Sequence, residues 1–400
     1  MQRPMIYFLL LFVGAGALRA SSPAGAITYL VFPPENLSGS ASLAWVGEAL
    51  AFSISEQLRV PGIEVLSRED RLNFVEGADL PPNAALSRAS MIHVAQSASA
   101  DRLAMGSYVG SDENLQVSLR VLDVKSMKLG REIVIGGPSV ALPEIENQLA
   151  WTLLVNAGVS NVISRERFRE RTRAIPNEAY SYFVRSFSQS EPEEQAKLLT
   201  RAVELFPGFP EAQSRLGAYY YAQADCAKSI PHLELVVASR ANSLDDRFKL
   251  GTCYLKQGNL PEAIRSLAGI LEFVKSPQVM NNLGVAYLRK GDYTLAAESL
   301  IEARTAAQTE ATILMNLALV RYLQGDYAGA RSILEEAARL DPKRGMAPFL
   351  LGSVWGKLGD PEKAGAAMAE AKRLGLDPDK LSSDDPKTWA RPFNLWTSGQ

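Results

Sequence analysis

Two patterns of apolar residues divide the chain. Between about residues 27 and 157, short apolar runs alternate with amphipathic stretches, whereas from Asn177 onward the apolar residues recur at helical spacing and in a repeating order. The two parts need separate interpretations, and together they predict a protein of more than one domain.

The first part has the pattern of a mixed α/β domain. The strand predicted over 115–124 alternates Leu115 and Val117 with Gln116 and Ser118. One of its faces should therefore be buried and the other partly exposed to solvent. Elsewhere, short β-rich runs predict strands, and apolar residues at spacings of three and four predict helices. The predicted strands are 27–32, 62–67, 102–109, 115–124 and 131–136, and the predicted helices are 43–58, 84–100 and 143–157. This order, βαβαβββα, indicates a mixed sheet with helices packed on it.

The second part is a sequence repeat. Five leucines that each precede a glycine or alanine follow one another at spacings of 34, 33, 34 and 34 residues: Leu216, Leu250, Leu283, Leu317 and Leu351. Seven residues after each small residue stands a helix breaker, which is a glycine in every copy but the first. Small residues let the two helices of a hairpin approach to about 8–10 Å, and a glycine accepts the positive φ that ends a helix. One hairpin cannot bury its apolar stripe alone, so the hairpins should stack into a right-handed solenoid with a concave face.

This repeat resembles the tetratricopeptide repeat. Besides the small residues, the resemblance rests on large apolar residues of the first helix, namely Tyr220, Tyr254, Tyr287 and Trp355. It implies an all-α solenoid of helical hairpins, with five repeats over 210–380 and an earlier, degenerate copy over 178–209. The tail over 381–400 departs from the pattern. Its aromatic residues Trp389, Phe393 and Trp396 predict a segment that folds back to cover the last repeat, and a disordered tail that offers these rings to a partner is the alternative.

The domain predicted over 27–160 resembles the TolB-type amino-terminal domain of bacterial envelope proteins. Val31–Gly39, Trp45–Leu50 and Ile63–Arg68 carry the resemblance, and Ala100–Tyr108 and Val117–Val124 continue it in the same order. The resemblance implies a non-catalytic αβ module of the cell envelope rather than a reaction.

The amino terminus has the features of a secretory signal. Arg3 precedes the uncharged apolar run Met5–Leu18, which is too short for a membrane-spanning helix of about 20 residues. We expect residues 1–26 to be a signal peptide that is cleaved after Ala20 or Ala26, and an uncleaved anchor is the alternative. Cleavage would leave a periplasmic chain with no stable membrane span.

A run of charged residues separates the two parts. The stretch Ser164–Arg173 contains five arginines and two glutamates, placed at almost every position. It predicts a solvated connector over 161–177, and contact with phosphate or lipid headgroups is the alternative.

The composition and the few histidines and cysteines limit the ligands and reactions that this chain could support. The 42 lysines and arginines against 44 aspartates and glutamates give a net charge of −2, so no global basic field would hold a nucleic acid. His93 and His232 are the two histidines, and neither has a Ser or Cys partner that repeat geometry would place beside it. The sequence contains neither a Gly-rich phosphate loop with its lysine nor a Cys-x-x-Cys motif. We therefore expect no enzymatic activity, no cofactor and no metal site.

The repeat register nominates the lining of the concave groove. By the resemblance, a partner would contact Tyr221, Phe248, Leu255, Asn281, Val285, Arg289, Met315 and Tyr322. Thr252, Val285 and Leu319 stand where chaperone-binding members of the family place the asparagine of a carboxylate clamp, so recognition of a terminal carboxylate is not expected. An apolar groove suits an extended or helical peptide when its edges are polar, and here the edges are Lys249, Asn281, Asn282 and Arg289. The alternative is that several of these residues pack against the tail or the first domain.

Two cysteines fall in neighbouring repeats. Cys226 opens the second helix of one repeat and Cys253 lies in the first helix of the next, so a disulfide is geometrically conceivable and two buried thiols are the alternative.

The sequence as a whole predicts a protein that binds other proteins. We expect a scaffold or adaptor of the cell envelope with protein or peptide partners in the groove. A periplasmic sensor or ligand-binding subunit that uses the αβ domain is the alternative.

Overall fold

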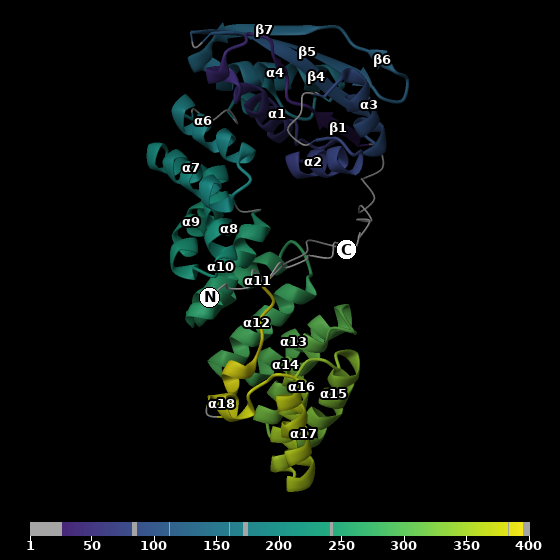
Figure 1. The fold of residues 1–400 in the computed structure, drawn as a ribbon, viewed down its shortest axis with the longest axis vertical. Helices are drawn as coiled ribbons and strands as arrows, with labels where there is room; N and C mark the ends of the chain where they lie inside the picture. The colour runs from purple at the N-terminus through teal and green to yellow at the C-terminus, as the bar shows by residue number, and fades with distance from the viewer. Residues whose placement is uncertain are drawn as a thin grey trace, which may run out of the picture. The chain divides into compact units, whose positions relative to one another are not determined.

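The computed structural model describes residues 26–81, 86–111, 113–159, 161–170, 175–240, 243–382 and 384–394. The predicted signal segment and Trp396 lie outside these ranges, apart from Ala26. The chain divides into two compact units, the first holding the described parts of Met1–Ala41 and Leu50–Thr172, the second Ser42–Ala49 and Arg173–Ser398. Figure 1 colours the sheet of the first unit purple to blue and the helices of the second unit teal to yellow.

The first unit is built on a seven-stranded sheet. Its strands are β1 (Ile27–Val31), β2 (Glu35–Asn36), β3 (Ile63–Val65), β4 (Arg102–Gly110), β5 (Asn114–Asp123), β6 (Lys128–Leu129) and β7 (Ile133–Pro138). The strand β1 lies between β3 and β4 and is parallel to both, whereas β5 is antiparallel to β4, β6 and β7. The predicted mixed sheet is confirmed. The two-residue strands β2 and β6 are additions to the prediction, because such short pairings leave no periodic signal.

The helices of the first part of the chain are α1 (Val46–Gln57), α2 (Arg68–Gly77), α3 (Arg88–Ser97), α4 (Leu142–Asn156) and α5 (Arg165–Arg169), with 3-10 turns η1 (Ala41–Leu43) and η2 (Ser139–Ala141). The sequence analysis missed α2, which buries only Arg71 and Val75 and so has little apolar periodicity. A capping box begins it: Ser67 Oγ accepts from the Asp70 N–H at 3.0 Å, and Asp70 Oδ2 accepts from the Ser67 N–H at 2.8 Å.

The expected alternation along β5 holds over most of its length. Leu115, Val117 and Leu119 are buried, and Gln116 is exposed. Leu122 breaks the pattern, since it is buried in a second apolar cluster with residues of α2, α3, β1 and β4. Both faces of the sheet are therefore covered near this end of β5.

The Arg-rich stretch is only partly the solvated connector that the sequence predicts. Arg167 and Arg169 are exposed, but Phe168 between them is fully buried, with its ring 5.4 Å from that of Trp151 on α4. Arg165 donates to Asn147 Oδ1 at 2.9 Å. The helix α5 docks on α4 because the charged run contains one large apolar side chain that gains by burial.

The second unit is a series of helical hairpins. Its helices are α6 (Asn177–Arg185), α7 (Pro192–Leu205), α8 (Pro210–Ala222), α9 (Cys226–Ser239), α10 (Leu244–Gln257), α11 (Leu260–Leu271), α12 (Pro277–Lys290), α13 (Tyr293–Ala306), α14 (Ala311–Leu323), α15 (Tyr327–Leu340), α16 (Met346–Lys357), α17 (Pro361–Arg373) and α18 (Pro378–Ser382), with 3-10 turns η3 (Ser186–Ser188) and η4 (Pro386–Trp389). The predicted solenoid of helical hairpins is present, and α6 and α7 form the degenerate first hairpin.

The recurring glycines lie where two helices of a hairpin touch. A Cβ on Gly217, Gly251 or Gly284 would come within 2.6–2.8 Å of a leucine side chain on the second helix of the same hairpin. The breakers behave as expected, since Gly258 and Gly291 end their helices with φ of +78° and +92°. The small residues of the repeat are thus explained in two ways: some let the two helices of a hairpin approach closely, and others end the first helix.

Candidate functional site

All eight residues predicted to line the groove lie on the first helices of hairpins, α8, α10, α12 and α14. We call the surface formed by these helices and α16 the first-helix face. Six of the eight are buried and two, Arg289 and Tyr322, are half-buried. The chain's own carboxy-terminal segment is what covers much of this face.

Residues 389–394 are here called the carboxy-terminal arm. The arm starts at Trp389, the last residue of η4, and leaves it in extended conformation, with Ala390 at φ −62° and ψ 136°. The arm begins beside Phe349 of α16, whose ring centroid lies 4.9 Å from that of Trp389. It ends beside Tyr221 of α8, whose hydroxyl donates to the Asn394 carbonyl at 2.7 Å. The tail packs on the last repeat, as predicted, and the arm then continues across the first-helix face to α8, where polar side chains pair with its backbone. Several predicted lining residues therefore pack against the tail, which was the alternative interpretation of the groove.

Three asparagines bind the backbone of the arm. Asn281 Nδ2 donates to the Arg391 carbonyl at 3.3 Å, and the other two each bind an N–H and a carbonyl of one residue. Asn316 Nδ2 donates to the Arg391 carbonyl at 2.9 Å, and Asn316 Oδ1 accepts from the Arg391 N–H at 2.9 Å. Asn282 repeats this with Phe393, donating to its carbonyl at 2.8 Å and accepting from its N–H at 2.6 Å. Each of these two carboxamides thus makes the two hydrogen bonds that a neighbouring β-strand would make to that residue. Arg391 and Phe393 are two residues apart, so in an extended chain they face the same side.

Further hydrogen bonds hold the asparagines in place. Asn316 donates to Asn281 Oδ1 at 2.8 Å, and Asn282 donates to Thr252 Oγ1 at 3.2 Å. Asn281 and Asn282 are fully buried, and Asn316 is nearly so. A buried polar group without a partner costs about 1–3 kcal/mol, so this network favours one orientation of the two carboxamides.

Arg289 binds the start of the arm. Its Nη2 donates to the Ala390 carbonyl at 3.2 Å, and its Nη1 donates to the Leu255 carbonyl at 3.0 Å. Burial lowers the pKa of Arg289, and the positive charge of Arg391 lowers it further. Ala390 itself is fully buried, so little more than a methyl group fits at this position.

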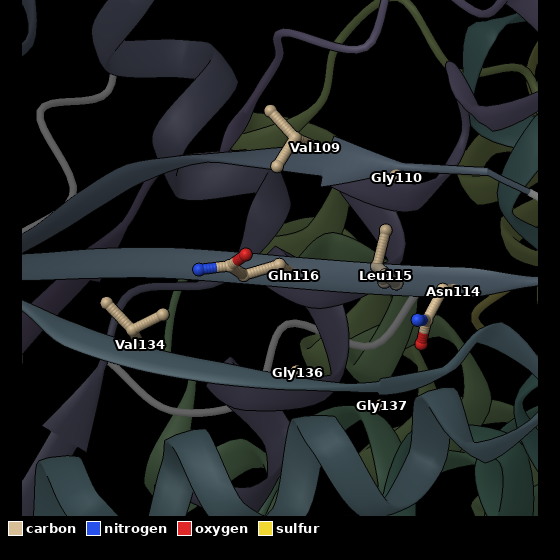
Figure 2. Close-up of a pocket in the computed structure, with 8 residues that line it drawn as sticks. All are labelled: Val109, Gly110, Asn114, Leu115, Gln116, Val134, Gly136 and Gly137. Carbon is tan, nitrogen blue, oxygen red and sulfur yellow. The ribbon is translucent and has the colours of Figure 1, made fainter.

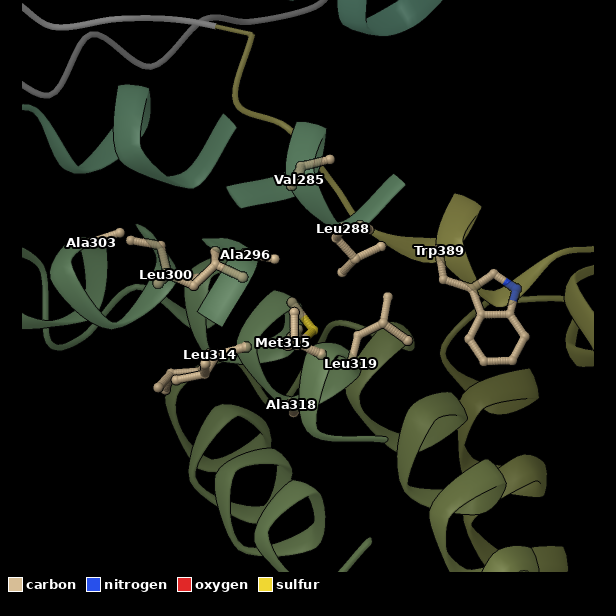
Figure 3. Close-up of a cluster of buried hydrophobic side chains, with 14 of the residues drawn as sticks. Val285, Leu288, Ala296, Leu300, Ala303, Leu314, Met315, Ala318, Leu319 and Trp389 are labelled. Atoms are coloured by element: carbon tan, nitrogen blue, oxygen red, sulfur yellow. The ribbon is translucent and has the colours of Figure 1, made fainter. Parts of the chain in front are cut away.

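Aromatic side chains anchor the arm. Trp389 joins a buried cluster that includes Val285, Leu288, Met315 and Leu319, as Figure 3 shows. Its indole N–H donates to the Leu381 carbonyl at 3.1 Å, which satisfies its one donor. Phe393 is half-buried against the same cluster and against a second one around Phe248 and Leu283.

The structure thus brings the predicted lining residues together around the arm. Asn316 is the important residue that the sequence analysis missed. Asn282 and Asn316 each stand immediately before the leucine of the Leu-small pair in their repeats, a position that other repeats fill with Arg215, Lys249 or Leu350. Two asparagines at one repeat position were the signal that could have found the pair.

The structure joins Cys226 and Cys253 in a disulfide. The sulfur atoms are 2.18 Å apart and the Cα atoms 5.1 Å apart. The bond links α9 to α10 and lies in a small apolar cluster with Tyr221 and Ile230. It therefore connects two successive hairpins next to the residue that binds the end of the arm.

The first unit carries a separate depression over β4, β5 and β7, shown in Figure 2. It is lined by Val109, Gly110, Asn114, Leu115, Gln116, Val134, Gly136 and Gly137. None of these side chains is ionisable. Across the described ranges, no three His, Cys, Asp or Glu residues are grouped as metal ligands, and no helix is both long and apolar enough to cross a membrane.

The profile of the tetratricopeptide repeat matches residues 248–311, 281–345 and 315–379. These residues are tetratricopeptide repeats. The resemblance seen in the sequence is confirmed for this part of the chain, which includes Asn282, Arg289 and Asn316. The TolB-type resemblance of the first part stays a prediction.

Two curated relatives share part of the chain. The bovine (Bos taurus) BBSome complex member BBS4 is 24% identical over 287 residues, and the match covers 65% of this chain and 55% of the relative. The murine (Mus musculus) protein of the same name is 36% identical over 100 residues, with 25% of this chain and 19% of the relative covered. The chain therefore spans about half the length of these relatives or less. Among solved structures, pilF of Pseudomonas aeruginosa aligns at 17% identity and a TM-score of 0.40, covering 50% of this chain and 92% of that chain.

Proposed function

We propose that this chain is a non-catalytic scaffold that binds an extended segment of a partner protein on the first-helix face of its tetratricopeptide repeats. The observation that carries the proposal is the double pairing of Asn282 and Asn316 with peptide backbone. The two carboxamides also bond to the preceding hairpin, through Thr252 and Asn281. The donor and acceptor that each directs at the arm suit the backbone of a peptide in extended conformation. The name of the two relatives, members of a complex, supports a place in a multi-protein assembly.

We also propose that the scaffold works outside the cytoplasm, in the periplasm of a bacterial envelope. The basic start and short apolar run of residues 1–18 support secretion. The disulfide between Cys226 and Cys253 supports it independently, because disulfides persist in oxidising compartments and are rare in the cytosol. Fractionation of cells, with alkylation of free thiols before lysis, tests this: a cytoplasmic chain with two free thiols would contradict it.

Partner capture with matched variants tests the binding function. The tagged full chain would be recovered from its own cells after crosslinking, as wild type, as Asn282→Ala with Asn316→Ala, and as Asn259→Ala. Asn259 is exposed at the start of α11 and makes no side-chain capping bond, so its variant controls for loss of a carboxamide. We expect one set of partners to be lost only from the double variant. Identical partners in all three samples would contradict binding at the first-helix face.

A further inference from the structure

The hydrogen bonds of Asn282, Asn316 and Arg289 to the arm all go to its backbone. Asn282 and Asn316 pair with both backbone groups of one residue each, and Arg289 donates to the carbonyl of Ala390. Backbone contacts of this kind give affinity without selecting side chains. The same atoms can therefore hold any extended segment that presents two residues at i and i+2.

Selectivity comes from the side chains of the arm. Trp389 is 6% exposed in an aromatic and aliphatic cluster, Ala390 is fully buried, and Phe393 is half-buried. Arg391 points its side chain to solvent. Pro392 lacks an N–H, and it stands between the two residues whose N–H groups the asparagines bind, so its missing donor costs no pairing.

We propose that the first-helix face takes a partner segment of the pattern Trp-Ala-x-Pro-Phe in extended conformation, and that residues 389–394 occupy this site in cis until such a segment displaces them. This inference rests on the proposed function and adds the class of ligand and the competition that controls it. The arm is the template for the partner, because each of its buried side chains fills space that the ligand must also fill.

The position x does not select a side chain, because that of Arg391 is exposed. At this position only the backbone is bound, by Asn316.

A tethered arm competes strongly even when its intrinsic affinity is modest. A segment on a short tether acts at an effective concentration in the mM range. A peptide added in trans can bind only to the fraction of molecules whose arm has left the site. Release of the arm should therefore raise the apparent affinity for a free peptide by about tenfold or more.

Binding of a labelled synthetic peptide with the sequence of residues 385–394 tests the proposal by fluorescence anisotropy. The proteins are the full chain as wild type, as Ala390→Asp, which forces a charge into a fully buried position of the arm, and as Ala366→Asp, an exposed position of α17. Trp389→Ala is a second way to release the arm. Thermal unfolding of each protein shows whether it is folded.

We expect Ala390→Asp and Trp389→Ala to bind the peptide about tenfold more tightly than wild type or Ala366→Asp do. Adding Asn316→Ala to Ala390→Asp should abolish binding. Folded arm variants that bind no better than wild type would overturn the proposal. So would equal binding of a scrambled peptide.

The same proteins distinguish an arm bound in cis from an arm supplied by a second copy. If the arm of a second copy filled the site, the wild-type mass measured by light scattering would be that of a dimer and Ala390→Asp would be a monomer, which overturns occupation in cis. The peptide assay needs no natural partner. Partner capture can therefore fail while peptide binding succeeds, and the failure of the proposed function stays distinguishable from failure of this inference.

Discussion

At the scale of single residues, size decides more positions than chemistry. Gly217, Gly251 and Gly284 are required because a leucine of the second helix occupies the space that a Cβ would fill. The asparagines of the first-helix face are the exception, since their role depends on donors and acceptors and not on volume.

Gly284→Ala and Gly365→Ala form a matched pair that tests the role of size. A Cβ on Gly284 would lie 2.6 Å from Leu300 Cγ, whereas one on Gly365 of α17 meets nothing within 4 Å. We expect Gly284→Ala to lower the free energy of unfolding by about 1–3 kcal/mol because of overpacking. Gly365→Ala should raise it by up to about 1 kcal/mol through helix propensity. Chemical denaturation measures both, and equal effects would contradict the packing argument.

Asn316→Ala tests the polar network. It leaves the N–H of Arg391 and Oδ1 of Asn281 without their bonds to Asn316. We expect the free energy of unfolding to fall by about 1–3 kcal/mol, and the Arg391 amide to exchange its hydrogen faster. The exposed Asn259→Ala should change stability by less than about 0.5 kcal/mol. Unchanged exchange at Arg391 would show that Asn316 does not hold the arm.

Tyr221 gives the end of the arm a pH dependence. Burial raises the pKa of its hydroxyl to about 12, above the usual 10.0, so the folded state disfavours ionisation. The resulting stability is fully present below pH 10 and is lost as pH rises to about 12. The difference in unfolding free energy between wild type and Tyr221→Phe should therefore shrink over this window. A difference that stays constant with pH would contradict this role.

At the scale of elements, the hairpin is the unit that the sequence encodes. Glycines end first helices, small residues bring the two helices together, and each hairpin packs against its neighbours. The disulfide adds a covalent link between the hairpins α8–α9 and α10–α11. It closes a loop across a sequence separation of 27 residues, which restricts the unfolded chain.

Replacing both cysteines, Cys226→Ser with Cys253→Ala, tests that link. We expect the free energy of unfolding to fall by about 2–4 kcal/mol under oxidising conditions, as for a loop of this length. Wild type treated with a reductant should approach the stability of the double variant. A stability that is the same with and without reductant would mean that the bond contributes nothing.

At the scale of the whole molecule, the arm changes how the repeats depend on one another. Hairpins of a solenoid contact only their neighbours, so their stabilities add nearly independently. The arm contacts α16, α14, α12 and α8, and so connects the hairpin α8–α9 with hairpins that are not its neighbours in the chain.

Release of the arm should therefore make the repeats unfold less cooperatively. We expect Ala390→Asp to lower the denaturant m-value of the repeat unit and to speed hydrogen exchange in the first helices α12 and α14 before the others. Ala366→Asp serves as the control. Exchange that rises equally in all hairpins would indicate general destabilisation and not loss of the arm.

The sequence by itself determined the repeated hairpins and the mixed sheet, because these depend on local periodicity and on residues such as Gly258 and Gly291 that end a helix through their own backbone conformation. It also placed the eight predicted lining residues on one surface, the first-helix face, since residues at one repeat position share one surface. It did not show that Asn316 pairs with Arg391, that Phe168 docks on Trp151, or that the arm crosses several hairpins. Those contacts join residues far apart in the chain, and only the tertiary structure decides which of several suitable surfaces an aromatic segment will cover.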